Sequence, residues 1–272
     1  MKIASLDNRH RQEIFRLLKK DVGANLFLID ILMRRGISKW GRESWFGVFE
    51  KDSLIAISVG LGRAKKGEQA KLIVGYGNNN ACQSLGELEM ERGGAEMLIG
   101  ERTATDALYQ GMGRPKNRLH TDQRLYSCVQ ISPGPQLACR WATPEDFESI
   151  CRYSALMMFE DLGINPLAEN PVRHVSSVQH RLQNQKTQIG EMNGEVCFVL
   201  DVGTIFKLGA QVGGTYVPKD FRGKGLSKQG MRWTTGELLK KCDCVTLHVN
   251  ESNIPAIRCY EAVGYKPSTA YR

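Results

Sequence analysis

The 272-residue sequence has no long hydrophobic run, and no stretch approaches the ~20 apolar residues that a membrane-spanning helix needs. Its first residues, MKIASLDNRHRQEIF, lack the apolar region of a signal peptide. Hydrophobic residues make up 42% and charged residues 24% of the chain, which is ordinary for a globular protein. We therefore expect no membrane partner and a cytoplasmic location.

The sequence also lacks paired cysteines. Eight cysteines are scattered along the chain, and no two of them form a C-x-x-C pair. Cys242 and Cys244 lie one residue apart, but no second pair completes a tetrahedral zinc site. Buried free thiols are a more common role for such cysteines than metal binding or redox chemistry. We therefore predict no metal site.

A concentrated basic stripe is absent as well. The formal net charge of +8 favours anionic partners, a class that includes nucleotides, nucleic acids and acidic surfaces. The positive charges are spread in short clusters in polar stretches, which are more typical of solvated loops than of a nucleic-acid surface. A nucleic-acid partner is therefore not favoured.

The length of the chain predicts two domains, because single domains usually contain ~100–150 residues. The best linker candidate is ISPGPQ at 131–136, where two prolines interrupt helix and strand alike. It separates a domain at 1–130 from a domain at 137–272. Each half opens with an extended run followed by a helix, and in the second half Thr143 and Pro144 predict the start of that helix. This likeness indicates a tandem repeat of one fold, although many α/β domains open in this way.

Further along the first half, the pattern predicts a helix and a series of strands. The helix is expected at 21–35, strands within 45–61, 70–76 and 95–101, and a second helix at 102–113. In the second half we expect extended structure at 195–217, a helix that runs through Lys241, a strand at 245–249, and a last helix that Gly264 ends.

One strand-to-helix turn in the second half carries unusual chemistry, the stretch TYVPKDFRGKGLSK at 215–228. Pro218 cannot donate to a strand ladder, so the strand ends near it. The backbone N–H groups of residues 223–227 lie in or before the first helical turn, where they have no intrahelical partner and the helix dipole adds positive charge. Glycines allow close approach, and Arg222 and Lys224 add formal charge. The turn suits a pyrophosphate.

Two well-known phosphate motifs do not fit this turn. The P-loop pattern fails because Gly225 stands where Ser or Thr is required, and the dinucleotide fingerprint fails because Lys228 replaces its third glycine. Taken alone, the short motif is equally compatible with a ligand-binding turn and with a turn that is merely tight. We place the 95–113 segment of the first half at the corresponding position, and its strand-to-helix turn lacks the Gly-x-Gly chemistry.

The turn and a second motif together resemble the GNAT superfamily of acetyl-CoA-dependent N-acetyltransferases. Arg222, Gly225 and Ser227 match its Arg/Gln-x-x-Gly-x-Gly/Ala signature, with serine as a mild departure at the last position. Asn253, Ala256 and Tyr260 match its second motif in NIPAIRCYEAVGY. The resemblance is strong over 195–267, and before residue 131 it concerns architecture alone. It implies an α/β (α+β) chain of two GNAT-like domains, each a mixed, mostly antiparallel sheet flanked by helices, with a degenerate first domain.

The resemblance also implies roles for individual residues. The cofactor is expected to be acetyl-CoA or another acyl-CoA, and the acceptor an amine. Main-chain donors from Arg222 to Ser227 would hold the CoA pyrophosphate, the strand residues before the turn would pair with the pantetheine arm, and Asn253 would bond to that arm. Tyr260 would protonate the departing thiolate. The expected cofactor-binding residues are Tyr216, Val217, Arg222, Gly223, Lys224, Gly225, Leu226, Ser227 and Asn253.

The sequence leaves the general base open. Many relatives carry a glutamate on the strand before the turn, and AQVGGTYVP has no acid or histidine. Deprotonation can pass through water, Tyr216 or another residue; His248 is one candidate, although its pattern is more typical of a core histidine. Glu160 and Asp161 follow the first helix of this half, where they would bind a cationic amine or, equally well, form a solvated acidic loop.

The function that we predict is acetyl transfer from acetyl-CoA to a primary amine of a small molecule or peptide, by direct attack. One alternative is a non-catalytic acyl-CoA-binding or regulatory protein, which the missing strand acid favours. A less favoured alternative is a tandem-domain aminoacyl transferase that uses charged tRNA, and steep salt-dependent RNA binding would support it.

Overall fold

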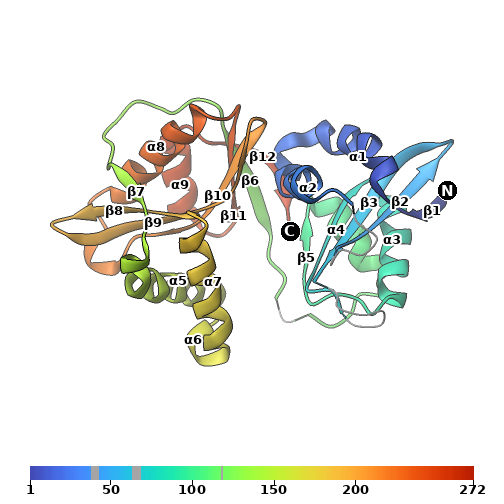
Figure 1. Ribbon diagram of the computed structural model, residues 1–272, viewed down its shortest axis with the longest axis horizontal. Helices are drawn as coiled ribbons and strands as arrows, with labels where there is room; N and C mark the ends of the chain where they lie inside the picture. Colours follow the sequence, from blue (N-terminus) through green and yellow to red (C-terminus); the bar gives the residue numbers. More distant parts are fainter. Residues whose placement is uncertain (38–42, 63–68, 118) are drawn as a thin grey trace. The chain divides into compact units, whose positions relative to one another are not determined.

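The computed structural model describes residues 1–37, 43–62, 69–117 and 119–272. It divides into two compact units (Figure 1). The first unit consists of Met1–Leu125 with His248–Glu251 and Ser268–Arg272, and the second of Tyr126–Leu247 with Ser252–Pro267. The linker candidate at 131–136 lies within the second unit, and the domain limits drawn from it stay a prediction.

The first unit is built on a five-stranded sheet of order β1-β2-β3-β4-β5. Neighbouring strands are antiparallel except β4 and β5, which are parallel. Helices α1 and α2 cover one face of the sheet, and α3 and α4 cover the other (Figure 1). The elements are β1 Lys2–Ser5, α1 Arg11–Leu18, α2 Val22–Arg35, β2 Glu43–Glu50, β3 Ser53–Leu61, β4 Leu72–Gly77, α3 Asn79–Glu91, β5 Leu98–Gly100 and α4 Arg102–Gly111.

The second unit repeats this order of elements. Its helices are α5 Phe147–Leu162, α6 Pro166–Glu169, α7 Pro171–Gln183, α8 Leu226–Leu239 and α9 Ile254–Val263, and its strands are β7 Cys139–Trp141, β8 Thr187–Met192, β9 Glu195–Phe206 and β10 Gly209–Tyr216. The seven-stranded sheet has the order β12-β6-β11-β10-β9-β8-β7. It includes three strands whose residues are divided between the units, β6 Gln123–Cys128, β11 Val245–Asn250 and β12 Lys266–Tyr271.

Consecutive residues of β9 face two different layers of helices in the second unit. Val199 of β9 belongs to a core cluster with Ile150 of α5 and Val178 of α7, all buried. Its neighbour Phe198 faces α8, where a side chain on Gly230 would come within 2.5 Å of the Phe198 ring. The period of two along β9 therefore sends consecutive residues to opposite faces of the sheet.

The predicted fold class is confirmed: both sheets are mixed and mostly antiparallel, and helices flank them. One assignment in the first half is wrong. The counterpart of β10, the turn and α8 is β4 with α3, because each of these strands is followed by a helix and then by a parallel partner strand. The 95–113 segment contains β5 and α4, which correspond to β11 and α9.

Candidate functional site

The turn before α8 has the backbone of an open cradle. Gly223 and Gly225 adopt φ angles of +78° and +74°, in the left-handed region that favours glycine. Gly225 is the N-cap of α8 and gives the helix no side-chain cap. The Gly225 carbonyl accepts a hydrogen bond from the Gln229 N–H at 3.2 Å. A side chain on Gly223 would meet no atom within 4 Å. Close approach of an anion to these amides is therefore unobstructed.

Strand β10, which leads into the turn, leaves its parallel partner early. It pairs with β11 at Ala210 and Gln211, while β10 itself continues to Tyr216. On its other side the pairing with β9 is irregular between Gly213 and Tyr216. Gly214, within this irregular stretch, has a φ of +58°, and a side chain there would come within 2.7 Å of an Asp201 carboxylate oxygen. The last residues of β10 thus face outward on the β11 side, where an extended chain can add to a strand edge.

Tyr260 lies on α9, the helix that follows β11. Burial raises the pKa of its phenol to about 12, against the lowering effect of a hydrogen bond with Thr215 of β10, and the charge of Asp161 adds to the rise. The hydroxyl therefore keeps its proton at neutral pH. At the start of the same helix, the Asn253 side chain accepts from the Ala256 N–H at 3.2 Å and caps α9.

The two acidic residues of α5 lie near these groups. The Glu160 carboxylate accepts from Arg222 Nη2 at 2.7 Å and from the Tyr216 hydroxyl at 3.3 Å. Burial, and then the neighbouring Glu160 charge, raise the pKa of Asp161. Burial and the Glu160 charge likewise raise the pKa of Tyr216. The structure thus brings the acids of α5 together with β10 and with the turn, which sequence alone left open.

The remaining residues predicted at the turn have partners within the unit. Lys224 Nζ donates to the Asp220 carbonyl at 3.3 Å and lies 5.3 Å from the centre of the Phe221 ring. The Val217 carbonyl accepts from Arg222 Nε at 2.9 Å. The side chain of Leu226 is buried, so that this residue offers its backbone amide alone.

Three residues that the sequence did not single out complete the site. Thr215 bonds to Tyr260, Tyr153 of α5 packs against Tyr216 with ring centres 5.9 Å apart, and Cys259 lies 3.2 Å from the Ser227 hydroxyl (Sγ to Oγ). Thr215 stands inside the quoted turn stretch, one residue before Tyr216. Tyr153 had no signal beyond its place on the apolar face of α5.

His248, the histidine considered as a base, is part of a core. Its ring stacks on Tyr271 with the centres 4.0 Å apart, and burial lowers its pKa to about 4. The imidazole is therefore neutral at physiological pH. Its surroundings are those of a packed aromatic pair in the first unit.

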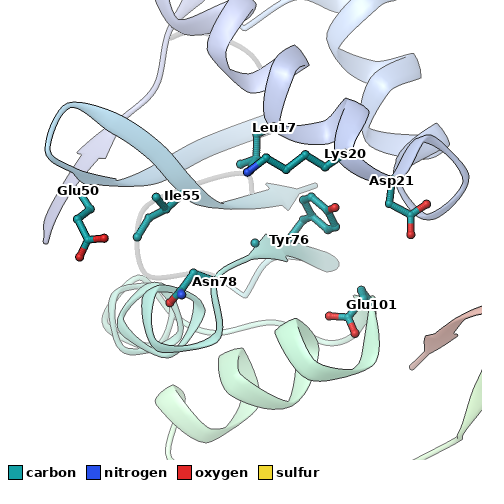
Figure 2. Close-up of a pocket in the computed structure, with 9 residues that line it drawn as sticks. Leu17, Lys20, Asp21, Glu50, Ile55, Tyr76, Asn78 and Glu101 are labelled. Atoms are coloured by element: carbon teal, nitrogen blue, oxygen red, sulfur yellow. The ribbon is translucent and has the colours of Figure 1, made fainter.

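The first unit has a cavity of about 470 Å³ at the end of β4, next to the start of α3 (Figure 2). In Figure 2 the Tyr76 ring lies on the side of the cavity where Asp21 and Glu101 stand, and Glu50 marks the far side. The Asp21 and Glu101 carboxylates also cap α2 and α4. With Lys20 as the one cation among the cavity's lining residues, this lining disfavours a diphosphate.

Two further classes of site were searched in the described part of the chain. Within residues 1–37, 43–62, 69–117 and 119–272, no helix is long and apolar enough to cross a bilayer. Over the same residues, histidine, cysteine and acidic side chains form no group of three or more that could hold a metal ion.

Comparison with known proteins agrees with this geometry. The acetyltransferase (GNAT) family matches residues 181–265, the segment that contains the turn and Tyr260. A GCN5-related N-acetyltransferase from Sphaerobacter thermophilus has a similar structure, with a TM-score of 0.62 and 17% identity, covering 99% of this chain and 93% of that one. No curated protein matches the chain.

Two other solved structures are similar along nearly the whole chain. An acetyltransferase of the GNAT family from Colwellia psychrerythraea gives a TM-score of 0.58 at 11% identity and covers 100% of this chain and 98% of its own. A tandem GNAT protein from the clavulanic acid biosynthesis pathway gives 0.54 at 12% identity, with coverages of 99% and 96%. At these identities the likeness concerns the fold.

The acetyltransferase (GNAT) family model thus matches a segment of the second unit, and the similar solved structures show that the whole chain has the fold of GNAT proteins, including that of a tandem GNAT protein. GNAT proteins are acetyltransferases that use acyl-CoA, and acetyl transfer from such a donor is the general activity that the family indicates.

Proposed function

We propose that this protein transfers an acetyl group from acetyl-CoA to a primary amine of a small molecule or peptide, and that the second unit carries out the reaction. The observation that supports this most directly is the uncapped start of α8, with its two left-handed glycines beside the free edge of β10. The turn offers main-chain donors, from Arg222 to Ser227, for the CoA diphosphate. Tyr216, the last residue of β10, and Val217, which follows it, would pair with the pantetheine arm, and Asn253 would form a hydrogen bond with that arm.

Acetyl-CoA supplies the acetyl group as a thioester, and the residues of this chain handle protons and charge. A new bond forms between the amine nitrogen and the acetyl carbon, and the bond from that carbon to sulfur breaks. Tyr260 donates its hydroxyl proton to the departing sulfur, which a phenol held protonated at neutral pH can do. Glu160 and Asp161 bind the amine, which is largely cationic in water because its pKa is about 10. The bound ammonium loses one proton to water or to a carboxylate before its nitrogen attacks. The nitrogen loses a second proton as the amide forms, and this proton passes through water to restore the Tyr260 hydroxyl.

The first test of this proposal is direct. Acetyl-CoA should bind to the intact protein in calorimetry, and mass spectrometry should detect an acetylated product when the protein and acetyl-CoA are mixed with a panel of free amino acids, polyamines and peptides. Acetyl-CoA binding without any acetylated product would favour the non-catalytic acyl-CoA-binding protein instead.

A pair of matched variants tests the turn itself. Gly225→Val should weaken acetyl-CoA binding by at least about tenfold, because a side chain at the N-cap keeps the diphosphate from the amides. Gly194→Val is the control: Gly194 has a φ of +79°, close to the +74° of Gly225, and lies in the β8–β9 hairpin with no atom within 4 Å of an added Cβ. Both variants carry the same backbone strain, roughly 1–2 kcal/mol. Equal acetyl-CoA affinities in the two would remove the turn from the cofactor site.

A further inference from the structure

The Arg222 side chain contacts both proposed substrate sites. It bonds to Val217, on the proposed path of acetyl-CoA, and to Glu160, which is proposed to bind the amine. Its Nε donates to the Val217 carbonyl at 2.9 Å, at the edge of β10 where the pantetheine arm would pair. Its Nη2 donates to Glu160 at 2.7 Å, and its guanidinium lies 5.3 Å from the centre of the Tyr216 ring. These contacts hold the guanidinium against β10 and α5.

Both oxygens of the Glu160 carboxylate have a donor in this arrangement. Oε2 accepts from Arg222 and Oε1 from the Tyr216 hydroxyl. The guanidinium also neutralises the charge that a cationic amine would need. Glu160 is therefore masked as an amine-binding group for as long as Arg222 is bound to it.

The ion pair is easily exchanged. The side chains of Arg222 and Glu160 are 43% and 31% exposed, and ion pairs so open to water contribute little to stability. A diphosphate at the start of α8 carries more charge than one carboxylate, and its oxygens suit the planar guanidinium. It also lies where the helix dipole already favours an anion.

We propose that Arg222 is a positioning residue that couples the two substrate sites, and this rests on the proposed function. A CoA diphosphate bound at the turn draws Arg222 away from Glu160 and from Val217. The edge of β10 is then free for the pantetheine arm, and the uncovered Glu160 carboxylate binds the ammonium group of the acceptor. Each substrate therefore strengthens the binding of the other.

The coupling can be measured with acetyl-CoA alone in a double-mutant cycle. Glu160→Gln removes the charge that competes for Arg222, so it should tighten acetyl-CoA binding roughly two- to fivefold in calorimetry. In an Arg222→Gln background the same Glu160→Gln change should have no effect on acetyl-CoA affinity, because the competition has gone. Glu148→Gln, at the exposed start of α5, is the matched control and should leave the affinity unchanged in both backgrounds.

Kinetics with an accepted amine complete the test. In Glu160→Gln the KM for that amine should rise at least about tenfold, since the carboxylate no longer meets the ammonium. A Glu160→Gln affinity for acetyl-CoA that is unchanged or weaker than that of the wild type, or the same gain in both backgrounds, would overturn the coupling while acetyl-CoA binding and acetylation persist. Failure of the wild type to bind acetyl-CoA would instead overturn the proposed function, and the coupling with it.

Discussion

A tyrosine can protonate a departing thiolate only if its hydroxyl carries a proton. Burial raises the pKa of Tyr260 to about 12, so its hydroxyl is protonated at neutral pH. We predict that Tyr260→Phe lowers kcat by about 100-fold, the usual contribution of a general acid, because the thiolate must then take its proton from water. The Kd of acetyl-CoA should stay within about twofold, since the phenol acts as the thioester breaks. Steady-state kinetics measures kcat, and calorimetry measures the Kd of acetyl-CoA.

Tyr265→Phe is the control for that variant. The Tyr265 ring lies 6.1 Å from that of Tyr260, and its hydroxyl forms a 2.8 Å hydrogen bond with Thr235. Its loss should lower the free energy of unfolding by about 1–3 kcal/mol, because Thr235 is left buried without this partner, and should leave kcat unchanged. If Tyr260→Phe and Tyr265→Phe had the same kcat, Tyr260 would have no role as an acid.

At the scale of single residues, the sequence indicated the turn well and its surroundings poorly. Gly223 and Gly225 could be predicted because an αL backbone demands glycine, and this demand is local. The pairing of Arg222 with Glu160 joins positions 62 residues apart, and no local pattern reports it. The electrostatic interaction of Asp161 with Tyr260 likewise joins residues of two helices, α5 and α9, that lie far apart in the sequence.

Helix α5 carries Glu160 and Asp161, the residues that we propose bind the amine. A polar cluster holds its start. The Asp146 carboxylate accepts from Arg140 of β7 at 2.7 and 2.9 Å and from the Thr143 N–H at 2.8 Å, while Arg140 also bonds to Glu191 of β8. We predict that Asp146→Ala lowers the free energy of unfolding by about 2 kcal/mol at pH 7, through loss of the hydrogen bond from the Thr143 N–H and of a partly buried ion pair.

The pH dependence of that loss has a definite sign. The hydrogen bonds from Arg140 hold the pKa of Asp146 below its ordinary value, so the stabilisation is present above the unfolded-state pKa of about 3.9 and disappears as the pH falls through the lower folded-state pKa. Urea unfolding of the wild type and of Asp146→Ala should therefore differ at pH 7 and differ less at a pH below 4. Curves that already coincide at pH 7 would contradict the prediction, and Glu148→Ala should give a small effect at both pH values.

Regular elements with a clear cap or period could be predicted from the sequence, as α2, α9 and the strands β3 and β11 show. Helix α3 could not. Gly86 stands in its middle, and glycine there normally argues against a helix. The structure gives the reason for it: a side chain on Gly86 would come within 2.2 Å of the Leu108 carbonyl of α4, so the two helices need glycine in order to pack closely. A sequence pattern in which α3 is not recognised places the first half's counterpart of the α8 turn at 95–113, which is wrong.

Over the whole molecule, the repeated order of elements could be anticipated from the two similar openings, but the return of two late segments to the first unit could not. His248–Glu251 and Ser268–Arg272 belong to the first unit, far in sequence from the rest of it. They are tied there by ion pairs such as those of Glu251 with Arg102 and of Arg272 with Asp106. Long-range pairings of this kind leave no periodic signal along the chain.

The repeat raises the question of how many acetyl-CoA molecules one chain binds, and we predict one. In the first unit the helix α3, which corresponds to α8, begins at Asn78, whose side chain caps the helix by accepting from the Ala81 N–H at 3.2 Å. The cap takes one of the amides that an anion would use. The adjoining cavity adds the charges of Glu50 and Glu101, which repel a diphosphate.

Calorimetric titration of the intact chain with acetyl-CoA should therefore give a stoichiometry near one, and Gly225→Val should weaken that single event by at least about tenfold. Removing the repulsion at the first unit is a stricter test. Glu101→Gln retains a side-chain oxygen to cap α4 and removes the charge, so the fold should persist. The stoichiometry should stay at one in this variant, because the Asn78 cap still occupies the start of α3. A stoichiometry of two in the wild type, or a binding event whose affinity Gly225→Val leaves unchanged, would place an acetyl-CoA site in the first unit and remove the physical distinction between the two halves.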